Sequence, residues 1–143
     1  MIKNINLENL IPLIKESLAN QQIVSFKPNG ISMYPTLVEN KDVVYLDNIK
    51  QLKKYDLILF SFNNKYYLHR LIKINKDNTY NFCGDNNVSI EKNVLKENLI
   101  AKVVKYEHNN IIVDCSKKSF YFKGFFITKL RIFKKIVRRI KRK

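Results

Sequence analysis

Residues 56–74 read DLILFSFNNKYYLHRLIKI, and this run predicts two β-strands joined by a tight turn. Residues 56–62 and 66–74 are rich in aliphatic and aromatic side chains, a composition that is typical of strands. Asn63 and Asn64 lie between the two runs, and such a pair readily forms a two-residue hairpin turn. We therefore expect an antiparallel hairpin at the centre of the chain.

Other parts of the chain repeat this pattern. Short strands are predicted at residues 23–26, 42–47, 79–83, 99–106 and 111–115, which brings the expected total to about seven. Near the N-terminus, apolar side chains recur at helical spacing and predict a short amphipathic helix: Leu7, Leu10, Ile11, Leu13, Ile14 and Leu18. The expected fold class is mostly β, with few helices.

The charge of the chain is concentrated near its C-terminus. The 143 residues include 27 Lys and Arg and 12 Asp and Glu, and residues 117–143 hold twelve of the basic residues and no acidic one. The length fits one domain, and the 45% hydrophobic content is enough for a core, which excludes a disordered acidic tail or a two-domain enzyme. Cys83 and Cys115 have no metal-binding spacing, so we expect no metal and no cofactor.

We expect three segments: an N-terminal helix at 1–22, a body at 23–116 and a basic amphipathic helix at 117–143. The apolar side chains of the last segment step by three or four: Phe122, Phe126, Leu130, Phe133, Val137 and Ile140. Three interpretations remain open: an interfacial helix on an anionic membrane, a nucleic-acid-binding arm, or a helix packed on the body with a solvated basic face. We favour the membrane surface as partner over nucleic acid, because nucleic-acid binding does not explain the apolar stripe.

The sequence shows no run near the roughly 20 apolar residues that a spanning helix needs. Glu8, Lys15 and Glu16 interrupt the first 20 residues, so no secretory signal is expected there either. We therefore expect a cytoplasmic protein, or one that is peripheral on the cell membrane.

A serine lies in a constrained segment between Asn29 and Leu37. Gly30 allows a sharp turn before Ser32, and Pro35 restricts the backbone after it. A serine held on such a turn can act as a nucleophile if a base reaches it. The alternative is a simple turn, because Gly, Ser and Pro are turn residues in any case.

His69 and Asp85 are the candidate partners of that serine. Strand alternation places His69 inside a strand among apolar neighbours, where it could act as a general base or simply be a satisfied core residue. His108 falls in a predicted hairpin turn, where we expect it to be solvated. Asp85 follows Gly84 at a strand end and could orient an imidazole, although Gly-Asp-Asn-Asn also makes a β-turn by itself.

Taken together, four segments in order resemble the sequence boxes of type I signal peptidases. Residues 30–37 resemble the nucleophile box, and residues 55–60 resemble the following Gly-Asp strand, with Tyr55 where Gly is usual. Residues 68–71 resemble the base box of the subgroup that uses His, and residues 84–87 resemble the closing Gly-Asp-Asn box. The self-cleaving repressor peptidases are related, but they use Lys as base and carry an N-terminal DNA-binding domain, for which the residues before the first strand leave little room.

The resemblance implies coiled antiparallel sheets of the signal-peptidase-like fold and a serine endopeptidase. It makes Ser32 the acylated nucleophile, His69 the general base and Asp85 the group that orients or charge-balances His69. Backbone N–H groups, that of Ser32 above all, are expected to hold the oxyanion. The oxyanion and substrate-binding part of the site is expected at Gly30, Ile31, Met33 and Pro35.

The implied substrate is a precursor peptide or preprotein, cleaved after small residues to release a signal or leader segment. A histidine base needs little desolvation, so we expect the rate to rise between about pH 6 and 7. A rate that keeps rising to about pH 9 would instead indicate a lysine base, Lys73 first. The alternative function is a catalytically inactive domain of the same fold that binds a membrane or a peptide.

Overall fold

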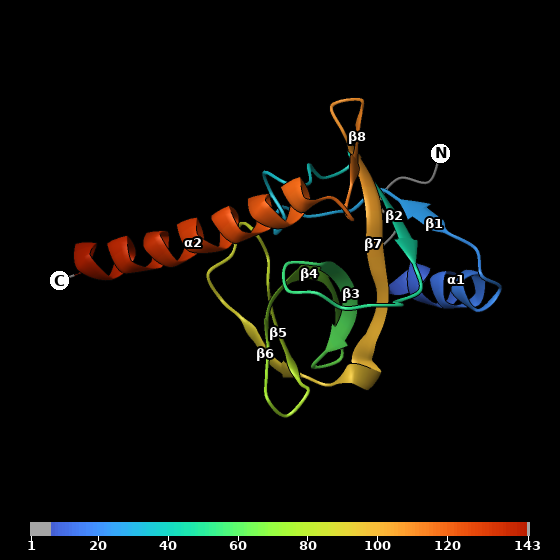
Figure 1. Cartoon of the computed structure of the whole chain (residues 1–143), viewed down its shortest axis with the longest axis horizontal. Helices are drawn as coiled ribbons and strands as arrows, with labels where there is room; N and C mark the ends of the chain where they lie inside the picture. Colours follow the sequence, from blue (N-terminus) through green and yellow to red (C-terminus); the bar gives the residue numbers. More distant parts are fainter. Residues whose placement is uncertain (1–6, 143) are drawn as a thin grey trace.

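The structure is a computed structural model that describes residues 7–142. These residues form one antiparallel sheet of eight strands with a helix at each end of the chain (Figure 1). In order, the elements are α1 (Leu7–Ala19), β1 (Val24–Phe26), β2 (Val43–Asp47), β3 (Leu57–Phe62), β4 (Lys65–Ile74), β5 (Tyr80–Cys83), β6 (Glu91–Val94), a 3-10 turn (Lys96–Asn98), β7 (Leu99–His108), β8 (Ile111–Asp114) and α2 (Lys118–Lys141).

The strand order in the sheet is β1-β2-β7-β3-β4-β5-β6, and β8 pairs with β7. The expected central hairpin is confirmed as β3–β4, and its turn residues Asn63 and Asn64 have φ of 50° and 62°, as a primed hairpin turn requires. The mostly β class is confirmed, and so are a helix in the N-terminal segment and one in the C-terminal segment. Residues 1–6 and 143 of these expected segments lie outside the described residues. The sequence analysis missed β6, a short strand whose inner residues Lys92 and Asn93 are polar and exposed.

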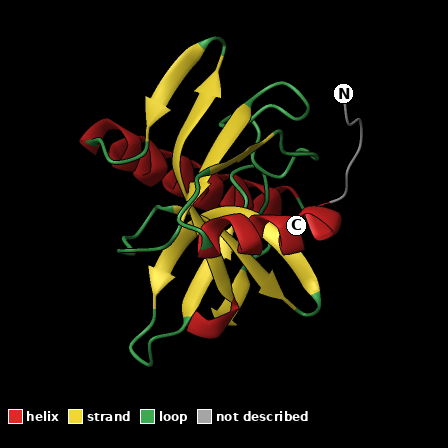
Figure 2. Ribbon diagram, turned by 90° about the vertical axis from the view of Figure 1, so that its right-hand side faces the viewer, coloured by secondary structure: helices red, strands yellow, loops and turns green. Residues whose placement is uncertain are grey.

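Strand β3 is buried on both faces and so joins two hydrophobic clusters. Leu57 and Leu59 belong to a cluster with residues of α1, β2 and β7, whereas Ile58 and Phe60 belong to a second cluster with residues of β4, β5 and β6. In Figure 1, β4, β5 and β6 curve away from the long strand β7, with which β3 pairs, and Figure 2 shows the strands extending in two directions from the middle of the molecule. Because side chains alternate along a strand, a continuous apolar run is what burial on both faces requires.

Helix α1 packs on the sheet through Ile11, Ile14 and Leu18, which follow helical spacing. Leu13, on the other side of the helix, is exposed. The packed face contributes to the same cluster as β2 and β7, so α1 lies against the body rather than apart from it.

Helix α2 begins against the body and then extends beyond it (Figure 1). Its buried residues are Phe120, Gly124, Thr128 and Arg131, which share one helix face. A Cβ on Gly124 would lie 2.7 Å from Arg70 Nη1 and 2.8 Å from Tyr55 Cβ, so only glycine permits this close approach. None of the helices within residues 7–142 is long and apolar enough to cross a membrane.

We predict that Gly124→Ala destabilises the protein by about 1–3 kcal/mol, because the added methyl group overlaps the buried Arg70 and the partly buried Tyr55. Helix propensity alone predicts the opposite sign, since alanine is favoured over glycine by about 1 kcal/mol in a helix. Urea unfolding followed by circular dichroism measures the difference, with the exposed Lys123→Ala on the same helix as control. A Gly124→Ala variant that is more stable than the wild type would contradict the close contact.

Candidate active site

Ser32 and His69 line the same cleft, which has a volume of about 280 Å³. The walls come from α1, β1, the loop after β1 and the first half of β4, and they combine apolar residues such as Leu7, Leu10 and Phe26 with polar ones. The Ser32 hydroxyl and the His69 ring share this cleft without a hydrogen bond between them. Catalytic hydrogen bonds often form only once a substrate is bound, so this geometry is compatible with a nucleophile and its base.

The loop that carries Ser32 is a compact turn. The Leu37 N–H donates to the Met33 carbonyl at 2.9 Å, and both side chains are buried. Gly30 has φ of +90°, and its N–H donates to the Glu39 carboxylate at 2.8 Å. The turn expected at Gly30 is therefore present, and the anchored residues on both sides hold the half-buried Ser32 at the cleft.

The loop after β5 fixes the serine turn from the other side. The Asn86 N–H donates to the Ser32 carbonyl at 2.9 Å, and the Asn86 side-chain amide donates to the Ile31 carbonyl at 3.1 Å. The Asp85 N–H points to the Met33 sulfur at 3.4 Å. A Cβ on Gly84 would lie 2.6 Å from the Ser32 carbonyl oxygen, so glycine is required where the two loops meet.

His69 is buried and bound to a carboxylate. Its Nδ1 lies 2.5 Å from Glu91 Oε1, and the side chains of both residues are at most 10% exposed. The ring is also held by aromatic neighbours, with centroids 5.2 Å from Tyr67 and 6.2 Å from Phe60. Because Glu91 occupies Nδ1, Nε2 is the nitrogen that is left to take a proton from a hydroxyl group.

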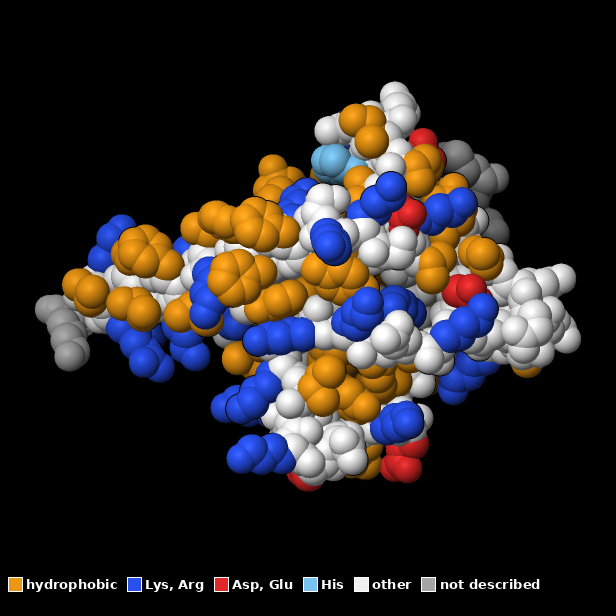
Figure 3. All heavy atoms as spheres, viewed as in Figure 1, with side chains coloured by type: hydrophobic (Ala, Val, Ile, Leu, Met, Phe, Trp, Pro, Cys, Tyr) orange, Lys and Arg blue, Asp and Glu red, His pale blue; other side chains and the backbone are white. Residues whose placement is uncertain are grey.

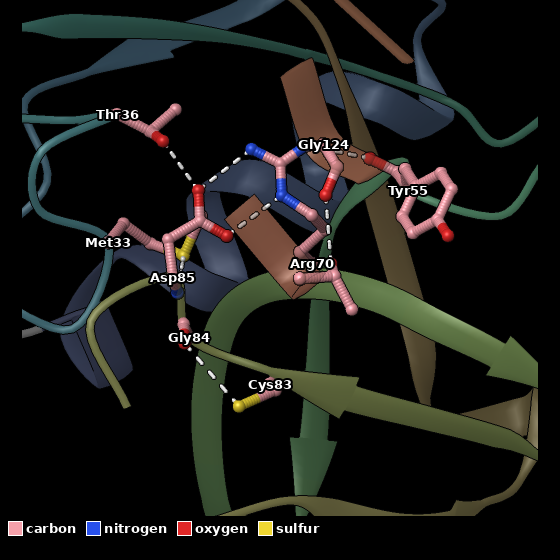
Figure 4. Close-up of polar contacts among 9 residues, drawn as sticks. Met33, Thr36, Tyr55, Arg70, Cys83, Gly84, Asp85 and Gly124 are labelled. Atoms are coloured by element: carbon pink, nitrogen blue, oxygen red, sulfur yellow. Dashed lines mark hydrogen bonds and ion pairs between the residues drawn. The ribbon is translucent and has the colours of Figure 1, made fainter. Parts of the chain in front are cut away.

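The expectation that Asp85 orients His69 is wrong in this structure. The Asp85 carboxylate accepts two hydrogen bonds of 2.8 Å from Arg70, through Nε and Nη2, and a third of 2.5 Å from the Thr36 hydroxyl (Figure 4). The physical reason is strand alternation: His69 and Arg70 are neighbours on β4 and point to opposite faces. Arg70 is paired with Cys83 across β4 and β5, so Asp85 follows on the Arg70 side.

Glu91 is the residue that the sequence analysis missed. It is the first residue of β6, the one strand that was not predicted, and it pairs with Phe82 of β5. The sequence did contain one signal, because Glu91 is a second acidic residue six positions after Asp85. That distance is long enough for the chain to reverse direction and form a strand beside β5. The residues between Asp85 and Glu91 are mostly polar, so they show no alternation of apolar and polar side chains. The sequence therefore did not indicate that Glu91 lies on the same face of the sheet as His69.

The other predicted residues divide between the cleft and its surroundings. Gly30 and Met33 line the cleft with Ser32, whereas Ile31 and Pro35 are exposed and are not part of its lining. Lys73, the alternative base, is an exposed residue of β4 outside the cleft. His108 is not simply solvated, because its Nδ1 lies 2.5 Å from Asp42 Oδ2.

The two cysteines, Cys83 and Cys115, are free and buried. Burial raises the pKa of the Cys83 thiol to about 11 and that of the Cys115 thiol to about 12, so neither is a ready nucleophile at neutral pH. Within residues 7–142, no three His, Cys, Asp or Glu side chains are grouped so that they could hold a metal ion.

Comparisons with family models, curated proteins and solved structures found no significant match to this chain.

We predict that Asp85→Ala lowers the free energy of unfolding by about 3–5 kcal/mol, because it leaves the Arg70 guanidinium buried without its carboxylate. The matched control is Glu97→Ala, which removes an exposed carboxylate and should change stability by less than about 0.5 kcal/mol. Urea denaturation measures both. Equal unfolding midpoints for the two variants would show that the Arg70–Asp85 pair contributes little.

Proposed function

We propose that this protein is a serine endopeptidase that releases a signal or leader segment from a precursor, with Ser32 as nucleophile and His69 as general base. The observation that carries the proposal is the joint placement of these two side chains in one cleft, with the base bound at Nδ1 by Glu91. Nucleophile, base and orienting carboxylate are the three parts of a serine-hydrolase site. The ordered resemblance to type I signal peptidases supports the same assignment.

In the proposed reaction, the Ser32 oxygen attacks the scissile carbonyl carbon while His69 Nε2 takes the hydroxyl proton. Glu91 stabilises the imidazolium that forms and keeps Nδ1 protonated throughout. The imidazolium then gives its proton to the amine that leaves, and the acyl group remains on Ser32. Water attacks this ester with His69 again as base, which releases the carboxyl product and restores the hydroxyl.

Two strand edges beside the cleft support a peptide as substrate. Strand β1 is an edge strand, so one of its two sides pairs with no other strand of the described sheet. In β4, residues 65–69 pair with β3, whereas pairing with β5 starts at Arg70. An extended peptide that adds to such an edge gains main-chain hydrogen bonds and places alternate side chains in the cleft. Small side chains before the scissile bond suit its modest volume.

The second candidate is a catalytically inactive domain of the same kind that only binds peptides. The missing hydrogen bond between Ser32 and His69 favours this alternative. The two candidates differ in whether Ser32 reacts, which the following experiment decides.

We predict that Ser32→Ala and His69→Ala each abolish cleavage of a library of leader peptides with small residues, and circular dichroism checks that each variant tested is folded. His108→Ala is the matched control, because His108 also binds a carboxylate but lies outside the cleft, and it should keep full activity. Mass spectrometry of the products identifies the cleaved bond. Cleavage that survives Ser32→Ala contradicts the proposed nucleophile, and peptide binding without cleavage by the wild type supports the inactive domain.

We predict that Glu91→Gln lowers kcat by roughly 100-fold or more, with a much smaller change in KM, because a neutral amide no longer stabilises the imidazolium. The exposed Glu97→Gln, on the segment that follows β6, is the matched control and should be silent. Steady-state kinetics on a cleaved peptide separates the two constants. An unchanged kcat for Glu91→Gln would show that Glu91 has no role in orienting the base.

A further inference from the structure

Helix α2 buries one face and leaves its apolar stripe uncovered. The face against the body consists of Phe120, Gly124, Thr128 and Arg131. Each residue of an α-helix is rotated by about 100° from the one before it, so residues two positions apart point in nearly opposite directions. Phe122 and Phe126, each two positions from Gly124, therefore face away from the body, and they are 65% and 54% exposed.

The same arrangement continues where the helix leaves the body. Phe133 is two positions from the buried Arg131 and is 62% exposed, and Ile140, a further seven residues on, is 67% exposed. In all, eight large apolar side chains of α2 are exposed: Phe122, Phe125, Phe126, Leu130, Ile132, Phe133, Ile136 and Ile140. Figure 3 shows apolar side chains along the helix, bordered by basic ones. So large an exposed apolar surface marks an interaction site.

The charges of α2 restrict what can cover this stripe. The helix carries nine Lys and Arg and no acidic residue. Lys129 lies within the stripe, between Phe126 and Phe133, with its Nζ 5.5 Å from the centre of the Phe125 ring. The basic side chains beyond Arg131 flank or oppose the stripe: Lys134, Lys135, Arg138, Arg139 and Lys141. A second copy of the helix would bring equal positive charge against this one and is disfavoured by repulsion. Nucleic acid would satisfy the charges but would leave the aromatic side chains in water.

We propose that α2 lies in the surface of an anionic lipid membrane, with the stripe of Phe122, Phe126, Phe133 and Ile140 inserted between headgroups. An interfacial helix has this composition: aromatic and aliphatic residues on one face, and Lys and Arg on the other and at the borders, where they reach anionic headgroups. Because the body packs on the opposite face of the helix, it stays on the aqueous side of the headgroups. The proposal concerns a partner and does not require that Ser32 be reactive.

The chain contains no tryptophan, so a single introduced tryptophan reports its own surroundings. We compare Phe133→Trp, on the stripe, with Lys135→Trp, two residues further on and on the opposite face. The probes are vesicles of phosphatidylcholine with phosphatidylglycerol, and of phosphatidylcholine alone. With the anionic vesicles, Phe133→Trp should shift its emission to the blue and be quenched by lipids brominated on their acyl chains, whereas Lys135→Trp should show neither effect.

Vesicle flotation of the full chain measures the affinity. Phe126→Ser combined with Phe133→Ser should weaken binding about tenfold or more, and about 1 M salt should weaken binding of the wild type. Ile111→Ser combined with Ile112→Ser, exposed on β8, is the matched control and should bind like the wild type.

Several results would overturn the proposal. Equal binding to phosphatidylcholine alone would refute the role of the anionic surface. An absence of vesicle binding, whether the chain is then found as a dimer, on nucleic acid or on an acidic protein, would refute the lipid partner. Equal quenching of Phe133→Trp and Lys135→Trp would refute the orientation. None of these results depends on peptidase activity, so the failure of this proposal and the failure of the proposed function are distinguishable.

Discussion

The buried ion pair between Arg70 and Asp85 connects several of the segments that surround the candidate site. Arg70 comes from β4, Asp85 from the loop after β5, and Thr36, which donates to the same carboxylate, from the serine turn. The Arg70 guanidinium also donates to the Tyr55 carbonyl and lies 5.3 Å from the centre of the Phe120 ring of α2. A buried charge must be compensated, so each of these segments is held where the guanidinium and the carboxylate need it.

Two carboxylates thus have separate tasks on the two faces of β4. Asp85 binds Arg70 and accepts a hydrogen bond from Thr36 of the serine turn, whereas Glu91 binds His69 at Nδ1 and leaves Nε2 for the step that we propose. The separation follows from strand geometry, because adjacent residues cannot point to the same face. A substitution of Asp85 therefore affects the packing of the segments around Arg70, whereas a substitution of Glu91 affects the orientation of the His69 ring.

Much of the fold could be predicted because its signals are local. The apolar run of residues 56–62, the Asn63-Asn64 turn and the helical spacing of α1 each arise from neighbouring residues, and all three are confirmed. Strand β6 could not be predicted, since its stability comes from pairing with β5 and not from its own composition. The partner of His69 was missed for the same reason: Glu91 and His69 meet only through the pairing of three strands.

The helix α2 shows a different limit of sequence reasoning. Its apolar stripe was predicted correctly, but periodicity does not say whether such a stripe faces the core or the outside. The close approach at Gly124 settles this, because it turns the face of Phe120 and Gly124 toward Arg70 and leaves Phe126 and Phe133 outward. A glycine within a helix was the only local sign of that contact.

The division of tasks between the two carboxylates is tested most directly by the ring nitrogens of His69. The chain has two histidines, so a His108→Asn variant leaves His69 as its only imidazole for long-range ¹⁵N–¹H NMR. At a pH high enough for the spectrum to show the neutral ring, our account predicts a proton on Nδ1 and none on Nε2. A proton on Nε2, or an average over both nitrogens, would contradict the assignment of Glu91 as the group that orients the base.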